Sequence, residues 1–387
     1  MTATSPSRND FLQPSSRPAG SISILDRPLE LSVIVPTFNE AANVDPLIEA
    51  LSAALRGRVF EVIFVDDDSG DGTADRVRER ASVDPRIRCL HRSGRRGLSS
   101  ACIEGIMASA APCVAVIDGD LQHDETLLPK MLDLLDTTDA DIVVGSRYVD
   151  GGGVGNWTAD RVKKSQFAGA LAKRLTGVEL SDPMSGFFMV RSETFRRAVP
   201  HLSAVGFKIL LDLFTSSPET LRFRELPYTF RSRERGESKL DNKVLLEFLE
   251  LLIEKSIGRW IPAKFIMFAL VGGSGVVVHF LVLSLLLGAW GVAFSSAHVV
   301  ATCVAMTWNY AINNVFTHHD KQLRGAQWLR GWLTFALASS IGAITNVGVA
   351  TYLFEQQGTV WYASALAGIA MGVVWNYAIT SVYTWRR

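Results

Sequence analysis

The first two thirds of the chain alternates short apolar runs with longer segments in which apolar residues recur at helical spacing. Apolar runs at 31–35, 61–65 and 114–117 have the length and β-branched content of buried strands. A helical pattern at 43–55 separates the first two runs, and the alternation continues as far as Asp118. Such alternation is typical of a parallel sheet with right-handed crossover helices. We therefore predict an α/β domain with a mostly parallel sheet, whose ligands bind beyond the carboxyl ends of the strands.

The last third of the chain consists of four long apolar segments, at about 264–288, 292–316, 328–354 and 358–383. Each is long enough to cross the hydrocarbon core of a bilayer, which needs about 20 residues. Residues 265–319 contain no Asp, Glu, Lys or Arg, so buried helices of a soluble domain are the weaker interpretation. We predict an all-α transmembrane domain.

These apolar segments contain an internal repeat. Phe-Ala-Leu at 268–270 returns at 335–337, and Trp-Asn-Tyr-Ala-Ile at 308–312 returns at 375–379, in both cases 67 positions later. The repeat predicts two tandem helical hairpins of the same orientation. It also pairs Asn309 with Asn376 and His279 with Asn346 at membrane depth. Hydrogen bonding between helices is the favoured interpretation of these side chains, and lipid headgroup binding or translocation is the alternative.

Basic residues gather on one side of the predicted membrane domain. The short loops at 288–292 and 355–358 carry only Glu355, whereas the opposite side collects Lys255, Arg259, Lys264, Lys321, Arg324, Arg330, Arg386 and Arg387. The positive-inside rule therefore predicts a multi-pass protein of the cell membrane with both termini and the α/β domain in the cytosol. Residues 1–28 are rich in Ser and Pro and lack the apolar core of a signal peptide, which predicts a disordered cytosolic tail.

The overall composition argues against nucleic acid as a partner. Lys and Arg number 39 and Asp and Glu number 39, so the chain has no overall positive field. Mean hydropathy is +0.18, which agrees with one domain in water and one in lipid. Cys89, Cys102, Cys113 and Cys303 show no paired spacing, which favours reduced thiols over disulfides or zinc. Nothing in the composition predicts an oligomeric state.

The predicted strand at 114–117 is followed by Asp118, Asp120 and Gln122. In an extended backbone, side chains two positions apart leave on the same side. Two carboxylates that face one point repel each other unless a cation lies between them, and Mg²⁺ or Mn²⁺ prefers oxygen ligands together with substrate phosphates. The three side chains are therefore a candidate metal site. A solvated acidic loop is the alternative for this short pattern taken alone.

Acidic residues follow three separate strands of the predicted sheet. Glu40, Asp67 and Asp118 all lie where a strand ends, so we expect them at one edge of the sheet. Acids there suit a nucleotide, because carboxylates accept hydrogen bonds from ribose hydroxyls and from ring N–H groups. The cluster at 66–71 has a second interpretation, as a solvated turn in which Asp71 or Thr73 caps the next helix.

Seven segments in order resemble the motifs of the polyprenyl (dolichyl) phosphate mannose synthases. They lie at 36–40, 65–69, 118–123, 144–148, 181–188, 206–208 and 233–240, and the last contains Gly-Glu-Ser-Lys-Leu at 236–240. These enzymes belong to the inverting glycosyltransferase family 2, with the GT-A fold. The resemblance implies a GT-A domain at 29–240, an amphipathic interface helix at 241–262 and a GtrA-like membrane domain at 263–387. It also implies a hexosyltransferase that moves mannose from GDP-mannose to a polyprenyl phosphate, with Mg²⁺ or Mn²⁺.

The resemblance assigns roles to matching positions. The base and ribose of GDP would be held by Pro36, Phe38, Glu40, Val65 and Asp67, with Gly119 close to the nucleotide. Asp118, Asp120 and Gln122 would bind the metal. The phosphates and the sugar would face Arg147, Lys208, Arg233 and Lys239, and Asp120 joins three of these as the catalytic set: Asp120, Arg147, Arg233 and Lys239. The chain departs from the family pattern at Phe38, where Tyr is frequent, and at Gly70, where Pro is usual.

The acceptor side is predicted from a glycine-rich loop and the helix that follows it. Gly151, Gly152, Gly153 and Gly155 predict a mobile loop. Arg161, after this loop, and Ser238 are the candidate acceptor ligands. Basic residues (Lys163, Lys164, Lys173 and Arg174) interleave with Phe167, Leu171 and Leu175, which predicts a helix with one apolar and one basic face. It can lie on an anionic membrane or be an ordinary surface helix.

Two other functions share part of this pattern. A glucosyl or N-acetylglucosaminyl transferase that uses a UDP-sugar would have the same acids and the same membrane domain. A translocase of lipid-linked sugar would need its cytosolic domain only to bind a nucleotide. The complete set of acids and cations favours a transferase, and the segments at 181–188 and 236–240 favour mannose.

Overall fold

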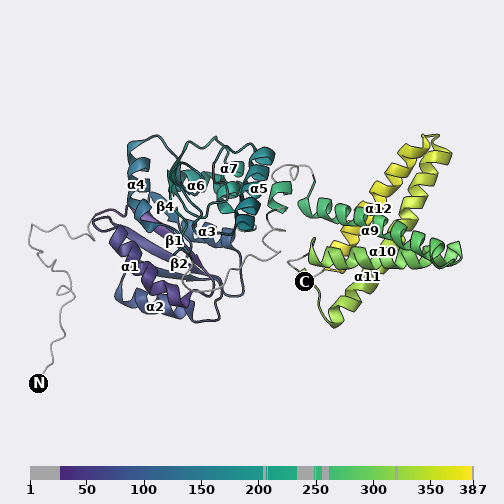
Figure 1. The fold of residues 1–387 in the computed structure, drawn as a ribbon, viewed down its shortest axis with the longest axis horizontal. Helices are drawn as coiled ribbons and strands as arrows, with labels where there is room; N and C mark the ends of the chain where they lie inside the picture. The colour runs from purple at the N-terminus through teal and green to yellow at the C-terminus, as the bar shows by residue number, and fades with distance from the viewer. Residues whose placement is uncertain are drawn as a thin grey trace, which may run out of the picture.

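The computed structural model describes residues 27–203, 206, 208–232, 248, 250–254, 261–318 and 321–385. Two bodies are visible in Figure 1, an α/β domain and a set of long helices. The predicted tail at 1–28 lies outside the described residues as far as residue 26, as does most of the segment at 241–262.

The α/β domain is built on a seven-stranded sheet with the order β3-β2-β1-β4-β6-β5-β7. Neighbouring strands pair in parallel except β6, which is antiparallel to both β4 and β5. The prediction of a mostly parallel sheet is therefore confirmed. The strands are β1 (Leu31–Thr37), β2 (Phe60–Asp66), β3 (Ile87–His91), β4 (Cys113–Val116), β5 (Ile142–Ser146), β6 (Phe188–Arg191) and β7 (Phe223–Pro227).

Helices cover both faces of the sheet because successive strand residues point to opposite sides. In β1, Val33 and Val35 pack against α1 and α4 on one face, whereas Ile34 packs against α3 on the other. The helices of this domain are α1 (Val44–Ala54), α2 (Thr73–Val83), α3 (Leu98–Met107), α4 (Leu128–Thr137), α5 (Ala159–Thr176), α6 (Ser192–Ala198) and α7 (Ile209–Ser216), with short turns at Ala41–Asn43, Glu125–Leu127 and Val199–His201.

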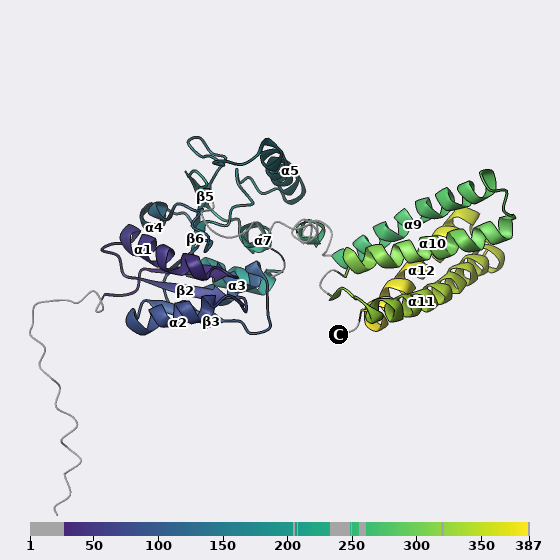
Figure 2. The ribbon, with the colours of Figure 1, turned by 60° about the horizontal axis from the view of Figure 1, so that its bottom comes forward.

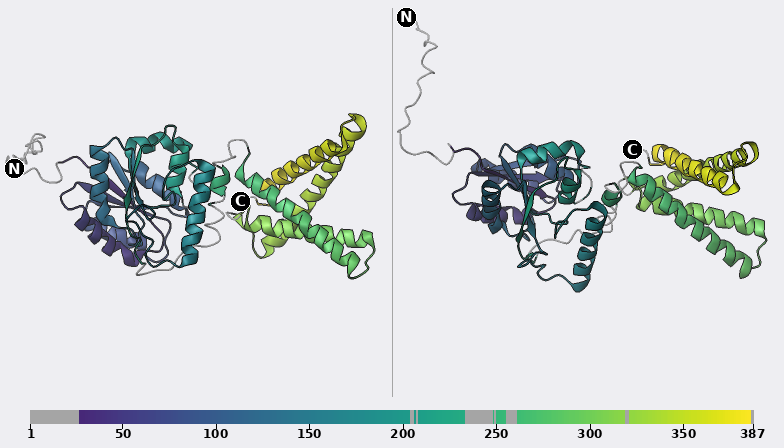
Figure 3. Two further views of the ribbon diagram at one scale, coloured as in Figure 1. Left: turned by 45° about the horizontal axis from the view of Figure 1, so that its top comes forward. Right: turned by 90° about the horizontal axis from the view of Figure 1, so that it is seen from above.

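The C-terminal body consists of two helical hairpins. The first is α9 (Ala263–Gly288) with α10 (Phe294–Val315), and the second is α11 (Ala326–Thr351), extended by a short π-helix at Tyr352–Gln356, with α12 (Trp361–Tyr383). The helices pack mainly within each hairpin, and Figure 3 shows the two pairs diverging, whereas in the view of Figure 2 the helices of both pairs run in nearly the same direction. By length and composition, α9 can cross a membrane. The spanning of all four helices stays a prediction.

The sequence repeat reappears as repeated contacts. A side chain on Gly275 of α9 would collide with the carboxamide of Asn309, and one on Gly342 of α11 would collide with that of Asn376. Both pairs are separated by the same 67 positions. The hairpins also exchange aromatic contacts, Tyr310 with Phe335 and Phe268 with Tyr377, each with ring centroids 5.6 Å apart. The tandem arrangement follows from these matched contacts.

One prediction about an amphipathic helix needs correction, and a second concerns a segment that is described only in part. In α5 the basic and apolar residues do not lie on opposite faces, because Phe167 stays 71% exposed while Ala172 forms the buried side. Positions 163 and 167 are one helical turn apart and so share a face. Within the predicted interface segment, the described residues Phe248 and Leu252 are buried in the core of the α/β domain. Their apolar side therefore covers the sheet domain.

Candidate active site

One edge of the sheet collects most of the predicted site residues. β1, β2, β4, β5 and β7 all end at this edge, and β6 begins there because it runs in the opposite direction. Residues that follow five strands, together with the 182–187 segment before β6, therefore meet in one region. Asp118, Arg147 and Asp182 are distant in sequence, and the sheet topology brings them to the same edge.

The segment after β4 leaves the strand conformation before it reaches the second aspartate. Residues 119 and 120 form a turn and Leu121 has a φ of 62°, so the expectation of an extended backbone through Asp120 is wrong. The turn buries Asp120 to 7% exposure, and its Oδ1 accepts a hydrogen bond from the Gln122 N–H at 3.2 Å. The side chain of Asp118 stays one-third exposed.

Gln122 is oriented by the chain that follows β7. Its Nε2 donates to the carbonyl oxygen of Arg231 at 2.9 Å, and the Arg231 N–H donates to the Gln122 carbonyl. Because the amide nitrogen is used in this way, the amide oxygen is the atom left to serve as a ligand. The same arginine is held by Asp124 and Glu125. The loop that carries the acids is thus attached to the chain after β7.

These three side chains supply only oxygen donors, which fits a hard divalent cation. In the part of the chain that the structure describes, no three His, Cys, Asp or Glu side chains gather into a metal site. A cation held by two carboxylates and one amide would need further oxygens from water and substrate phosphates, as Mg²⁺ usually does. The donor set therefore fits a metal that arrives with its nucleotide.

His123 is a site residue that sequence reasoning missed. Its Nδ1 accepts a hydrogen bond from the Asp118 backbone N–H at 3.2 Å, and its ring stacks on Phe187 at 5.3 Å. Burial lowers the pKa of His123 to about 4, although Asp120 opposes this shift. The ring is therefore neutral at physiological pH. Its protonated Nε2 faces the Asp118 carboxylate at 3.7 Å and helps to fix the position of that acid.

Arg147 lies in a buried ion pair. Its Nε and Nη2 donate to the two carboxylate oxygens of Asp182 at 2.7 and 2.8 Å, and its backbone N–H donates to the same group at 3.1 Å. Asp182 is fully buried and Arg147 is 8% exposed. Although burial disfavours the charge, these hydrogen bonds raise the pKa of Arg147. The sequence assigned no role to Asp182.

Lys208 lies near this pair at the start of α7. Its Nζ donates to the Met184 carbonyl at 3.5 Å. Burial, and then the nearby Arg147, lower the pKa of Lys208 to about 8. The site therefore contains two different cations. The Arg147 guanidinium is always charged, whereas the Lys208 ammonium loses its proton in the mildly alkaline range.

The residues predicted to hold the base and ribose lie at the ends of β1 and β2. Pro36 and Val65 are buried, and a side chain on Gly119 would come within 3.1 Å of Thr37. The Phe38 ring lies under the Arg96 guanidinium at 4.2 Å. The Glu40 carboxylate accepts from Asn43 at 2.7 Å.

Asp67 is already bound by protein groups in this structure. One carboxylate oxygen accepts from Arg92, which is 3% exposed, and the other accepts from the Gly97 N–H at 2.6 Å. Burial raises the pKa of Asp67, and these two contacts oppose the shift. Arg92 is a second residue that the sequence did not identify, because its partner Asp67 lies 25 positions away, after another strand.

The predicted acceptor side is described only in part. Arg161 lies in the first turn of α5, where its N–H donates to the capping hydroxyl of Thr158 at 3.4 Å and its guanidinium covers Trp157 at 4.1 Å. Arg233, Ser238 and Lys239 lie outside the described residues.

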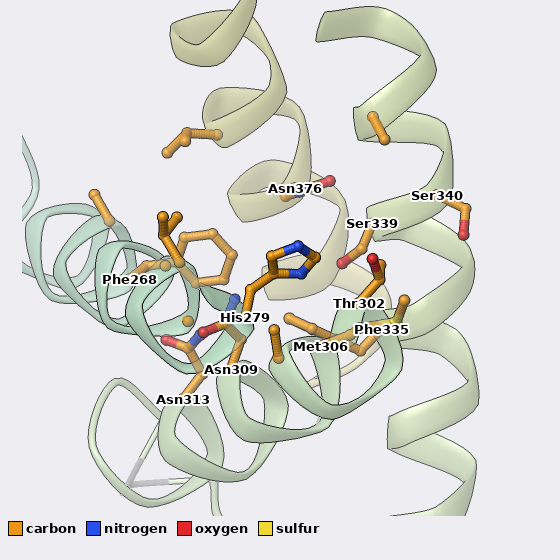
Figure 4. A pocket seen from close by; sticks show the side chains of 17 residues that line it. Phe268, His279, Thr302, Met306, Asn309, Asn313, Phe335, Ser339, Ser340 and Asn376 are labelled. Carbon is orange, nitrogen blue, oxygen red and sulfur yellow. The ribbon is translucent and has the colours of Figure 1, made fainter. Parts of the chain in front are cut away.

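A separate cavity lies between the two hairpins of the helical body. It measures about 410 Å³ and is lined by all four helices; Figure 4 shows His279, Asn309 and Asn376 around it. Among the described residues, the buried Oδ1 atoms of both asparagines have no hydrogen-bond partner. The carboxamides therefore pack against glycines as described above, and the predicted hydrogen bonds between helices are not seen at these two atoms.

Comparison with known proteins agrees with this architecture. The model of glycosyl transferase family 2 matches residues 32–198, and that of the GtrA/DPMS transmembrane domain matches residues 267–385. A dolichol-phosphate mannosyltransferase from Pyrococcus furiosus is 32% identical over 361 residues, which are 92% of this chain and 99% of the relative. A Saccharomyces cerevisiae protein of the same name is 34% identical over 62% of this chain and 92% of its own length.

One similar solved structure is the glucosyl-3-phosphoglycerate synthase of Mycobacterium tuberculosis in complex with Mn²⁺, UDP and glucosyl-3-phosphoglycerate. The TM-score is 0.46 and the sequence identity is 19%, and the match covers 62% of this chain and 86% of that chain. The full-length similarity to the Pyrococcus protein covers the sheet domain and the helical body together. The chain is a glycosyltransferase of family 2 and belongs to the family of dolichol-phosphate mannosyltransferases, in the form that carries a GtrA/DPMS transmembrane domain.

Proposed function

We propose that the protein transfers mannose from GDP-mannose to a polyprenyl phosphate at the cytosolic face of the membrane, with inversion at the anomeric carbon. The observation that carries the proposal is the convergence of Asp118, Asp120 and Gln122 with Arg147 and Lys208 at one sheet edge, in a chain that also has a membrane domain. The names of the relatives support mannose as the sugar and a polyprenyl phosphate as the acceptor.

The chemistry needs charge compensation more than a strong base. A phosphate oxygen of the acceptor forms a bond to C1 of mannose while the C1–O bond to GDP breaks, and the electron pair leaves with the diphosphate. The second pKa of a phosphate monoester is near about 6, so the nucleophile is already ionised at neutral pH. Asp118, Asp120 and Gln122 would hold Mg²⁺ or Mn²⁺, which would supply charge stabilisation for the diphosphate.

Each group of residues has a role in this proposal. Asp120, Arg147, Arg233 and Lys239 serve turnover, and Lys208 adds positive charge toward the donor phosphates. Pro36, Phe38, Glu40, Val65, Asp67 and Gly119 form the base and ribose side. The acceptor phosphate meets Arg161 and Ser238. Arginine suits such contacts because its planar guanidinium can bind two phosphate oxygens at once.

The membrane orientation follows from charge. Lys264 lies at the start of α9, Lys321 and Arg324 lie between α10 and α11, and Arg330 lies near the start of α11. The loops that join α9 to α10 and α11 to α12, at the opposite helix ends, lack Lys and Arg. We expect all four helices to span the bilayer, with both termini in the cytosol. A reporter fused after residue 387 that is active only in the cytosol agrees with this orientation. Activity only on the outer side contradicts it and removes the cytosolic donor site.

A change of pH separates the role of Lys208 from that of Arg147. If the charged form of Lys208 serves transfer, turnover at saturating substrate falls as pH rises through about 8, by about tenfold at pH 9, since only about a tenth of the lysine is still protonated one unit above its pKa. Lys208→Arg keeps its charge and is expected to flatten this alkaline limb. An identical fall in both proteins assigns the limb to another group.

Nucleotide binding distinguishes the proposal from its nearest rival, a transferase that uses UDP-glucose or UDP-GlcNAc. Calorimetry of the purified full chain with Mn²⁺ is expected to show tighter binding of GDP than of UDP. Tighter binding of UDP supports the rival. Binding of a nucleotide with no transfer under any condition supports a translocase with a nucleotide-binding domain.

A further inference from the structure

The glycine-rich loop is held against the chain that follows β7. Gly153 forms a parallel bridge with Thr229, donating to the Tyr228 carbonyl at 3.0 Å and accepting from the Phe230 N–H at 2.9 Å. Gly155 has a φ of 60°, and a side chain there would lie 2.2 Å from the Phe230 carbonyl oxygen. Only glycine fits so close to that backbone. The loop therefore delivers Trp157 to a fixed place beside Phe230.

The indole of Trp157 lies near two arginines from different parts of the proposed site. The Arg161 guanidinium is 4.1 Å from its ring centroid and the Arg147 guanidinium is 5.2 Å from it. Phe230 meets the ring edge to face at 5.5 Å. Two cations repel each other, whereas the negative face of an indole attracts a cation within about 6 Å. Trp157 therefore attracts both guanidinium groups.

Hydrogen bonding does not explain why this position is a tryptophan. Within the residues that the structure describes, the buried Nε1 of Trp157 has no hydrogen-bond partner. Its ring contacts with the described residues are aromatic and cation–π contacts. Two guanidinium groups lie near the ring, that of Arg147, which Asp182 holds, and that of Arg161 at the start of α5.

We infer that Trp157 is a positioning residue, which presents the Arg161 guanidinium to the acceptor phosphate by means of the face of its indole ring. The inference rests on the proposed function, because it deepens the acceptor role given there to Arg161. Asp182 fixes Arg147, Arg147 and Phe230 support Trp157, and Trp157 supports Arg161. Arg161, the proposed acceptor cation, is thereby connected through Trp157 to Arg147, which the proposal places on the donor side.

The test is steady-state kinetics of the full chain with polyprenyl phosphate and GDP-mannose varied in turn. Trp157→Leu removes the aromatic face and is expected to raise the KM for polyprenyl phosphate by about threefold to thirtyfold, the range of one cation–π interaction. The KM for GDP-mannose and kcat are expected to stay within about twofold. Trp157→Phe keeps an aromatic face and is expected to restore most of the acceptor affinity, because Phe also attracts a cation.

A double variant separates this role from simple packing. Since Trp157 acts through Arg161, Trp157→Leu combined with Arg161→Ala is expected to raise the acceptor KM no further than Arg161→Ala alone. Phe223→Leu is the matched control, because its ring forms a similar edge-to-face pair with Phe214 at 5.6 Å and has no described contact with a guanidinium. It is expected to leave both KM values unchanged.

Three results overturn the inference: an unchanged acceptor KM in Trp157→Leu, an equal rise in the KM of both substrates, or multiplied effects in the double variant. If Trp157→Leu unfolds, Trp157→Met gives the same test with a longer, unbranched and more flexible side chain, and the same three results decide it. Failure of the proposed function appears differently, as absence of mannosyl transfer to the lipid by the wild-type chain.

Discussion

Asp120→Ala is expected to lower turnover by about 100-fold or more, the loss typical of removing one preorganised electrostatic stabiliser. Asp120 is one of the two carboxylates at the proposed metal site, and its fixed position comes from burial and from the Gln122 N–H. Without it, the cation has fewer ligands and the departing diphosphate has less charge compensation. The measurement is the rate of lipid-linked mannose formation by the purified full chain at saturating GDP-mannose and Mn²⁺.

The control for this variant is Asp133→Ala. Asp133 lies on α4, pairs with Arg58 and has a side chain that is 57% exposed. It also removes one negative charge from the domain, and we expect turnover within about twofold of wild type because surface pairs contribute little. Normal turnover in Asp120→Ala, or in wild type with excess chelator, would contradict the metal role.

Asp182→Ala is expected to lower the free energy of unfolding of the α/β domain by about 3–5 kcal/mol, because it leaves the Arg147 charge buried without its partner. For a domain of this size the expected fall in unfolding temperature is on the order of 10 °C. The thiols of Cys102 and Cys113 are buried in the sheet domain, so their labelling during heating reports unfolding of that domain and not of the membrane helices.

Asp139→Ala is the comparison for this variant. Asp139 pairs with Arg222 at 3.4 Å, but its side chain is 64% exposed, and we expect a change below about 1 kcal/mol. Should Asp182→Ala and Asp139→Ala release the buried thiols at the same temperature, the Arg147–Asp182 pair does not stabilise the domain as described.

The alternation of strands and helices was enough to predict the sheet and the edge at which the acids gather. It was enough because buried parallel strands are continuous apolar runs, and their carboxyl ends share one edge. The direction of β6 could not be predicted in this way. That single antiparallel strand brings Asp182 to Arg147, so the partner of a predicted site residue was missed although its segment was recognised as a motif.

Local geometry at the site depends on contacts that are distant in sequence. The turn at 119–120 replaces the expected extended backbone, and His123 that supports it stacks on Phe187, 64 positions later. The ion pair of Arg92 with Asp67 likewise joins residues that are distant in sequence. In the helical body the opposite holds, since the repeat was visible in the sequence and its two Asn-on-Gly contacts follow the same spacing. Periodic patterns in the sequence were enough to predict the helices and strands. The residue pairs that connect different elements could be identified only from the fold.

The most direct test of the central claim is mannosyl transfer by the purified full chain in detergent or lipid vesicles that contain a polyprenyl phosphate. GDP-mannose, UDP-glucose and UDP-GlcNAc are supplied separately with Mg²⁺ or Mn²⁺, and the lipid-linked sugar is identified by mass spectrometry with the configuration of its anomeric bond. We predict β-linked polyprenyl phosphate mannose from GDP-mannose, none without the metal, and little product from either UDP-sugar. Transfer of glucose or N-acetylglucosamine from a UDP-sugar, with none of mannose, would contradict the account.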